Sequence, residues 1–322
     1  MDIFENGKLD SMNISEENAR DIVQNRKKST VTDPTETKPK NIKPVEVGRM
    51  AIPIEDLPSE GKFYPVGTSI SIRAAKVSEI RHFSTVQESD FLSIDDHLNS
   101  ILESCCKVHI PDSTMSNKKT TYKDILEIDR MFLVLAIRDL TFTEQNSKIR
   151  MNVECKKCGN KDVIEIDRFS IPKVKFEEKI EKFYSEEERC FIFKTKDGED
   201  TFKIRIPTLG MTEFTKTFAR SKVNDQAFID EGFLKFLLYY DEDYRNLNNN
   251  KLKTINEEMK KWSVKKLSLV TRVIDIIDRS IVMNITSTCS DCGEEGEYPI
   301  QFQDGYKSLF LVPEDDILDE LA

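Results

Sequence analysis

The chain has 322 residues, 38% of them hydrophobic and 33% charged, and its formal net charge is −10. This length allows one large domain or two of ordinary size, and the negative charge disfavours general binding to nucleic acid or to an anionic membrane surface. No apolar run approaches the ~20 residues of a membrane-spanning helix, and the acidic start MDIFENGKLD lacks the features of a secretory signal.

Residues 1–48 are predicted to form a disordered N-terminal tail. The stretch from Thr30 to Lys43 is rich in proline, threonine and lysine and contains almost no side chain that a core would bury. A short helix over Ser15–Gln24 would begin with an N-cap serine and acidic residues, but a helix of this length is marginal by itself. The alternative is that the tail becomes ordered when it binds a partner.

Residues 49–170 are predicted to form the first half of the folded chain and to end in a Cys-x-x-Cys motif. Alternating residues indicate strands, and apolar residues at helical spacing indicate helices. Ser78 is expected to cap the first helix, and Asp95 and Asp96 to form the acidic first turn of the second. The predicted elements are a strand over Thr68–Ala74, helices over Val77–Val86, Asp95–Cys106 and Tyr122–Leu140, and strands over 149–153 and 163–167.

Residues 171–310 are predicted to form the second half, which ends in a second Cys-x-x-Cys motif. Residues 171–190 are charged and irregular, and Asp197-Gly198 between two alternating runs is a strong β-hairpin signal. The other predicted elements are helices over Met211–Arg220, Gln226–Tyr240 and Ile255–Ile281, and strands over Met283–Thr286 and Tyr298–Phe302. Residues 311–322 are predicted to be an acidic C-terminal tail. The expected fold class is therefore α+β, with helices and short antiparallel hairpins.

The segments before the two motifs resemble each other. In both, a long apolar helix that contains Asp-Arg is followed by a strand that contains Met-Asn, as in DRMFLVLAIRDL with RMNVECKKCG and in RVIDIIDRSI with VMNITSTCSDCG. The order helix, strand, cysteine turn, strand therefore occurs twice. This pattern indicates a pseudo-repeat whose two copies pack together.

Four of the seven cysteines form the two motifs: Cys155, Cys158, Cys289 and Cys292. Without a secretory signal we expect a reducing cytosol, where close cysteine pairs are more often metal ligands or catalytic groups than disulfides. At the tip of a hairpin, a Cys-x-x-Cys turn followed by glycine points two sulfurs toward one position. Two such turns, here called knuckles, supply four thiolates for tetrahedral zinc. The sequence therefore predicts one structural zinc per chain, in a zinc-ribbon-like site that joins the two halves.

Catalytic chemistry has little support in the sequence. A redox motif of the thioredoxin type would open a helix, whereas both knuckles lie between predicted strands. A closed four-thiolate site has no position for water and does not imply catalysis. No phosphate-binding loop, nucleophile elbow or zinc-protease motif is present, so we predict no catalytic residues. The cysteines and histidines to which we assign no functional role are Cys105, Cys106, Cys190, His82, His97 and His109.

A longer pattern begins with LPSEG at Leu57, followed by Phe63-Tyr64-Pro65, the strand SISIRAA and Glu79. It continues through ILESCCKV, DRMFLVLAIRDLTF and the CKKCG knuckle. Together these features resemble the baseplate hub proteins and hub-assembly proteins of T-even-like contractile-tailed bacteriophages, over roughly residues 50–310. The most specific part is LPS-x-G-x-x-YP-x-G, because Cys-x-x-Cys pairs occur in many unrelated folds.

This resemblance implies a non-enzymatic role in building the central hub of a tail baseplate, as a virion subunit or as an assembly factor. It implies other hub or tail proteins as partners, and a location in the virion baseplate or in the host cytoplasm during assembly. No membrane, nucleic-acid or small-molecule partner is expected. The alternative is a zinc-ribbon protein that binds nucleic acid and regulates its use, which predicts basic knuckles. CKKCGNK is basic, but CSDCGEEGEY is acidic.

Overall fold

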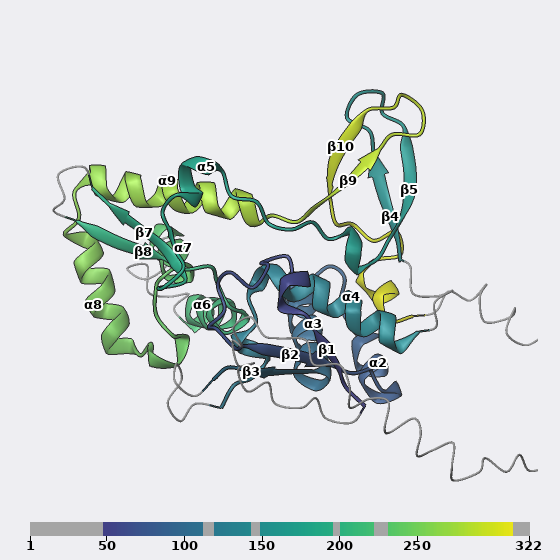
Figure 1. The fold of residues 1–322 in the computed structure, drawn as a ribbon, viewed down its shortest axis with the longest axis horizontal. Coiled ribbons are helices and arrows are strands. Elements are labelled where there is room, and N and C mark those ends of the chain that lie inside the picture. The colour runs from purple at the N-terminus through teal and green to yellow at the C-terminus, as the bar shows by residue number, and fades with distance from the viewer. Residues whose placement is uncertain (1–47, 112–118, 143–148, 196–199, 222–230, 312–322) are drawn as a thin grey trace, which may run out of the picture. The chain divides into compact units, whose positions relative to one another are not determined.

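The computed structural model describes residues 48–111, 119–142, 149–195, 200–221 and 231–311 (Figure 1). All of them belong to one compact unit, residues 42–322. They form helices and small antiparallel sheets, which confirms the α+β class. The predicted N-terminal tail up to residue 47, the Asp197-Gly198 turn and the acidic tail after residue 311 lie outside these ranges. None of the described helices is long and apolar enough to cross a membrane.

One three-stranded antiparallel sheet contains β1 (Met50–Ile52), β2 (Ser69–Ile72) and β3 (Cys106–His109), with β2 in the centre. The strand predicted over Thr68–Ala74 corresponds to β2. Because side chains alternate along a strand, the isoleucines of β2 are buried while its serines are only half-buried. The buried positions of β2 pair with buried positions of β3 and form one apolar layer.

Helix α2 (Val77–Phe83) follows β2, but Ser78 does not cap it as predicted. The helix begins after Lys76, because the Glu79 carboxylate accepts a hydrogen bond from the Lys76 N–H at 2.7 Å. The same carboxylate forms two hydrogen bonds with Arg73, at 2.6 and 2.9 Å. The start of α2 is therefore fixed by a charged side chain in its first turn.

Helix α3 (Phe91–Cys105) begins one turn earlier than predicted. Its N-cap is Asp90, whose carboxylate accepts the Leu92 N–H at 2.9 Å. Asp95 is therefore not in the first turn. It forms an ion pair with Arg130 at 2.8 Å instead, and so joins α3 to the next helix.

The helix predicted over Tyr122–Leu140 is wrong at its beginning. The structure has two 3-10 turns there, η3 (Tyr122–Asp124) and η4 (Glu127–Asp129), and α4 extends only over Arg130–Thr141. A distant residue helps to hold the first turn, because Arg245 donates to both carboxylate oxygens of Asp124 at 2.6 and 2.7 Å. The body of α4 is as predicted, since residues 132–138 are all buried.

Residues 57–65, here called the motif loop, are tied to η4 by one buried carboxylate. Asp129 is fully buried and accepts hydrogen bonds from the Ser59 N–H at 2.9 Å, the Ser59 hydroxyl at 2.8 Å and the Tyr64 hydroxyl at 2.8 Å. The Tyr64 oxygen accepts the Leu126 N–H at 3.0 Å. Burial raises the pKa of Asp129 to about 6, against the opposing effect of the Ser59 and Tyr64 donors. The LPSEGKFYP sequence therefore has a structural role in the core.

A second three-stranded antiparallel sheet packs its aromatic side chains against the motif loop. The Phe63 ring lies edge-on to the Tyr184 ring, with centroids 5.1 Å apart, and close to the Phe191 ring at 5.7 Å. The hairpin predicted around Asp197-Gly198 is confirmed in its two strands, which pair in antiparallel register. The elements here are α5 (Glu178–Glu181), β6 (Tyr184–Ser185), β7 (Cys190–Lys194) and β8 (Thr201–Ile204).

The helix predicted over Ile255–Ile281 is two helices in the structure. The chain breaks at Trp262, whose ring packs edge-on against Phe236 at 5.1 Å, and Ser263 caps the next helix by accepting the Lys266 N–H at 3.2 Å. The helical elements of this region are α6 (Leu209–Ser221), α7 (Glu231–Leu238), η8 (Tyr244–Asn246), α8 (Asn249–Lys260) and α9 (Val264–Ile281).

Two short hairpins carry the cysteine turns and lie side by side in Figure 1. Each follows a long helix, so the order helix, strand, knuckle, strand occurs twice, as predicted. Residues 301–303 do not continue the last strand but pair with the first hairpin, where the Gln303 N–H donates to the Arg150 carbonyl at 2.9 Å. The strands are β4 (Ile149–Glu154), β5 (Lys161–Ile166), β9 (Asn284–Thr288) and β10 (Glu295–Pro299).

Candidate metal centre

The two knuckles bring four sulfur atoms together from distant parts of the sequence. The Sγ atoms of Cys155, Cys158, Cys289 and Cys292 all lie within 4.8 Å of one another. The shortest distances cross between the hairpins, at 3.6 Å for Cys155 to Cys292 and 3.6 Å for Cys158 to Cys289. All four cysteines predicted as ligands therefore meet at one point.

Both knuckles have the same backbone geometry. In each, the N–H of the glycine after the motif donates to the carbonyl of the first cysteine, at 2.8 Å for Gly159 and 3.0 Å for Gly293. These glycines have φ values of +73° and +70°, a region that costs other residues roughly 1–2 kcal/mol. The N–H of the first cysteine then donates to the residue after the glycine, at 2.8 Å in both turns. The CxxCG sequence therefore forms the same hydrogen-bonded turn in both knuckles.

The two shortest sulfur–sulfur distances are close to those in a tetrahedral metal site. Zinc–sulfur bonds of about 2.3 Å imply sulfur–sulfur distances of roughly 3.8 Å in a regular tetrahedron, close to the two distances of 3.6 Å. A disulfide would need about 2.05 Å, and the four cysteines are free thiols. The cluster could therefore hold a metal ion by four thiolates.

The electrostatics also favour a cation at this point. Backbone N–H groups of Cys292 and Asp291 lower the pKa of the Cys289 thiol to about 6. For Cys158, the N–H of Asn160 favours the thiolate, but desolvation and the neighbouring sulfurs outweigh it and raise the pKa to about 12. Four thiolates this close repel one another, and a divalent cation would offset that repulsion.

Contacts between the two knuckles support the sulfur cluster from outside. Lys157 forms an ion pair with Glu294 at 2.7 Å. The Asn160 side-chain amide donates to the Ser290 hydroxyl at 3.3 Å and lies 3.9 Å from the Cys289 sulfur. Because Lys157 is paired, part of the positive charge of the first knuckle is neutralised within the chain. The arrangement gives no support to a nucleic-acid-binding surface at the knuckles.

The remaining cysteines and the paired histidines behave as small core groups or surface contacts. Cys105, Cys106 and Cys190 are 0%, 5% and 0% exposed, which confirms that they are buried. The rings of His82 and His97 stack between α2 and α3, with centroids 4.9 Å apart. None of these five residues joins the sulfur cluster.

Two features of the structure were not found by sequence reasoning. The ion pair between the knuckles had a signal, because the first knuckle is basic and the second is acidic. The Ser59–Asp129–Tyr64 network had none, because Asp129 lies in a segment predicted as regular helix. A carboxylate in such a segment is expected to face solvent, and only the folded chain shows that this one is buried.

Comparison with known proteins gives one match. Residues 49–310 match the family model described as T4 bacteriophage base plate protein. This range includes the motif loop and both knuckles. Neither a curated protein nor a solved structure matches the chain.

Proposed function

Since the chain belongs to the family of T4 bacteriophage base plate proteins, we propose that it is a component or assembly factor of the central hub of a phage tail baseplate. It acts there without catalysis, by binding other hub or tail proteins. The match over residues 49–310 is the observation that carries this proposal, because it extends over more than three quarters of the chain. The site of action is the virion baseplate, or the host cytoplasm while the baseplate assembles.

We further propose that the four cysteines bind one structural zinc ion per chain. The residues support this in three ways: four thiols within 4.8 Å, two knuckles with the same backbone hydrogen-bond pattern, and backbone N–H groups that favour a thiolate at Cys289. Four thiolates complete a tetrahedral zinc shell and leave no position for a reacting water. The metal would therefore supply stability rather than chemistry.

The zinc also has a place in the organisation of the chain. We propose that residues 49–170 and 171–310 are two halves, each of which ends in a knuckle, and that the metal joins them. The repeated order of α4, β4 and β5, and of α9, β9 and β10, supports this division. Binding energy at such a site becomes folding energy, because the site does not exist in the unfolded chain.

Quantitative mass spectrometry of purified virions and of infected cells tests the proposed role. A hub subunit is expected in virions at a fixed ratio to other baseplate proteins. An assembly factor is expected in cells, in complexes with baseplate proteins, but not in virions. Absence from both virions and baseplate-protein complexes would contradict the proposal.

Metal analysis of the purified full chain tests the zinc site separately. The expected content is about one zinc per chain, as one four-thiolate site requires. A content near two, or a folded chain that contains no metal, would contradict it. The result does not depend on the role of the protein in the phage.

A further inference from the structure

A large groove lies beside the motif loop, and its lining does not include the four knuckle cysteines. Its volume is about 1030 Å³, at the upper end of small-molecule pockets. Phe63, Tyr64 and Pro65 contribute to its apolar lining, together with the side chain of Val66, which is 56% exposed. The most specific sequence motif of the chain therefore ends at this groove.

The charged lining of the groove is strongly acidic. Seven carboxylates and three arginines line it. Three of the carboxylates, Glu186, Glu187 and Glu188, are consecutive and exposed. Another three, Asp241, Glu242 and Asp243, are consecutive on the segment before η8. Acidic residues from two segments distant in sequence thus meet around one apolar surface.

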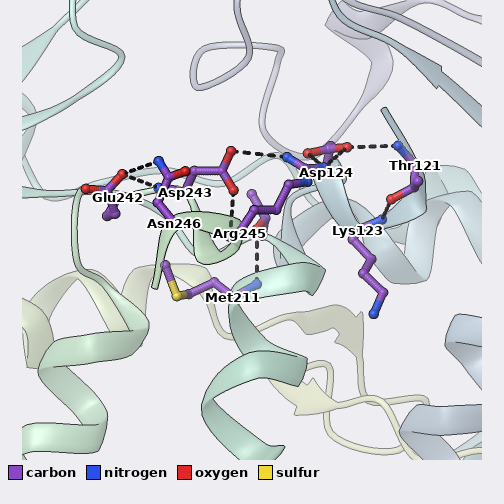
Figure 2. Close-up of polar contacts among 9 residues, drawn as sticks. Thr121, Lys123, Asp124, Met211, Glu242, Asp243, Arg245 and Asn246 are labelled. Carbon is purple, nitrogen blue, oxygen red and sulfur yellow. Dashed lines mark hydrogen bonds and ion pairs between the residues drawn. The ribbon is translucent and has the colours of Figure 1, made fainter. Parts of the chain in front are cut away.

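The three arginines are engaged within the chain. Arg245 lies between Asp124 and Asp243, at 2.6 Å from the first and 3.2 Å from the second (Figure 2). Arg205 forms an ion pair with Asp241 at 2.6 Å. Arg189 donates to the Tyr64 carbonyl and so holds the motif loop. The positive charges therefore fix the walls of the groove and are not directed at a ligand.

Two of the carboxylates that line the groove have no ion-pair partner among the residues that the structure describes. Glu188 has Lys203 as its partner at 2.8 Å, and Glu242 is paired with Lys251. Within the ranges that the structure describes, Glu186 and Glu187 have no cationic partner. The carboxylates that line the groove therefore outnumber its arginines, and Glu186 and Glu187 contribute uncompensated negative charge.

We propose that this groove binds an extended, basic segment of a partner protein. Side chains of an extended segment alternate between two faces, so apolar residues can cover Pro65 and Val66 while long basic side chains reach the carboxylates at the edge. Charge complementarity selects a basic occupant, and the size and apolar share of the groove suit a peptide better than a small cation. The inference rests on the proposed function only in naming another baseplate protein as the source of the segment.

The test uses the purified full chain and two fluorescein-labelled peptides, one of alternating lysine and valine and one of alternating glutamate and valine. The lysine peptide is expected to bind at a ratio of one to one, and more weakly at higher salt. The doubly substituted variant Glu186→Lys, Glu187→Lys should weaken this binding by at least about tenfold. The glutamate peptide should not bind the unmodified chain.

The matched control is the variant Glu257→Lys, Glu258→Lys, which reverses two consecutive exposed carboxylates on α8, outside the groove. Its affinity for the lysine peptide should change by less than about twofold. Equal losses in the two variants, no saturable binding, or equal binding of the glutamate peptide would overturn the proposal. Self-association of the chain that the groove variant abolishes would make a second copy the occupant and overturn it as well.

The outcome is separable from that of the proposed function. If the groove variant loses peptide binding but mass spectrometry finds no association of the chain with baseplate proteins, the proposed peptide-binding groove is supported and the proposed hub role is contradicted. If the chain associates with baseplate proteins but both variants bind the peptide as well as the unmodified chain does, the proposed hub role is supported and the proposed peptide-binding groove is contradicted.

Discussion

At the scale of single residues, the buried carboxylate of Asp129 accepts hydrogen bonds from Ser59 and Tyr64 and so holds the motif loop. We predict that Tyr64→Phe lowers the free energy of unfolding by about 1–3 kcal/mol, because it removes a donor to Asp129 and leaves the buried Leu126 N–H without an acceptor. Urea unfolding measures the change. Ser59→Ala should also destabilise, and the double variant should lose less than the sum, since both side chains bind the same carboxylate. A change below about 0.5 kcal/mol for Tyr64→Phe would contradict this account.

A second residue-scale prediction concerns acid stability. The Arg73 guanidinium lowers the pKa of Glu79 from its usual 4.5 to about 2. Because the folded state binds a proton less readily than the unfolded state, Glu79 stabilises the fold above pH ~4.5, and this contribution is lost as the pH falls toward ~2. Glu79→Gln should therefore be less stable than the natural chain near neutral pH, and the difference should shrink in acid.

The measurement is the difference in unfolding free energy between the two proteins, from about pH 6 to about pH 3. If the proposed zinc is lost in acid, it is lost from both proteins, so its effect on stability cancels in that difference. Arg73→Gln is the matched variant, because it removes the other partner of the same pair. A difference that stays constant over this range would show that the Glu79 carboxylate has no such role.

At the scale of elements, the sequence predicted the strands, helices and turns that depend on local pattern. It did not predict those that depend on contacts with residues distant in the sequence. The strand β2, the body of α4 and both CxxCG knuckles follow from alternation, helical spacing and a glycine with positive φ. The 3-10 turn η3, which lies where the sequence predicted the beginning of a helix, does not, because its Asp124 is held by Arg245, a residue 121 positions away. The break between α8 and α9 could have been predicted from Ser263, which caps α9. It was missed because the apolar residues keep a helical spacing across the break.

The knuckle is the element whose role is easiest to isolate. Cys289→Ser should reduce the zinc content from about one per chain to a small fraction of that, because serine is a poor ligand in a thiolate site. It should also lower the midpoint of thermal unfolding. Cys190→Ser is the matched control, since Cys190 is a buried free thiol outside the cluster. Equal zinc loss in both variants would contradict the assignment of the metal to the four knuckle cysteines.

At the scale of the whole molecule, residues 301–310 contact earlier parts of the chain at places other than the knuckles. Residues 301–303 pair with β4. Arg138 of α4 is 2% exposed and donates to the carbonyl of Leu309 at 2.6 Å. The backbone at Tyr306 and Lys307 donates to the Glu88 carboxylate, at 3.1 and 2.8 Å. Removal of the proposed zinc should therefore weaken the contact between the two proposed halves without separating them completely.

Substitution of Phe310 tests whether the end of the described chain stabilises the core. This residue is 1% exposed, and its ring lies edge-on to Phe83 of α2 with centroids 4.9 Å apart. Phe310→Ala should cost about 3–5 kcal/mol of unfolding free energy, as expected when a large side chain leaves a cavity in the core. The adjacent Leu311 is 44% exposed, so Leu311→Ala should change stability by no more than about 0.5 kcal/mol. Similar small effects in both variants, measured by urea unfolding of the purified full chain, would show that the Phe310 side chain does not stabilise the core.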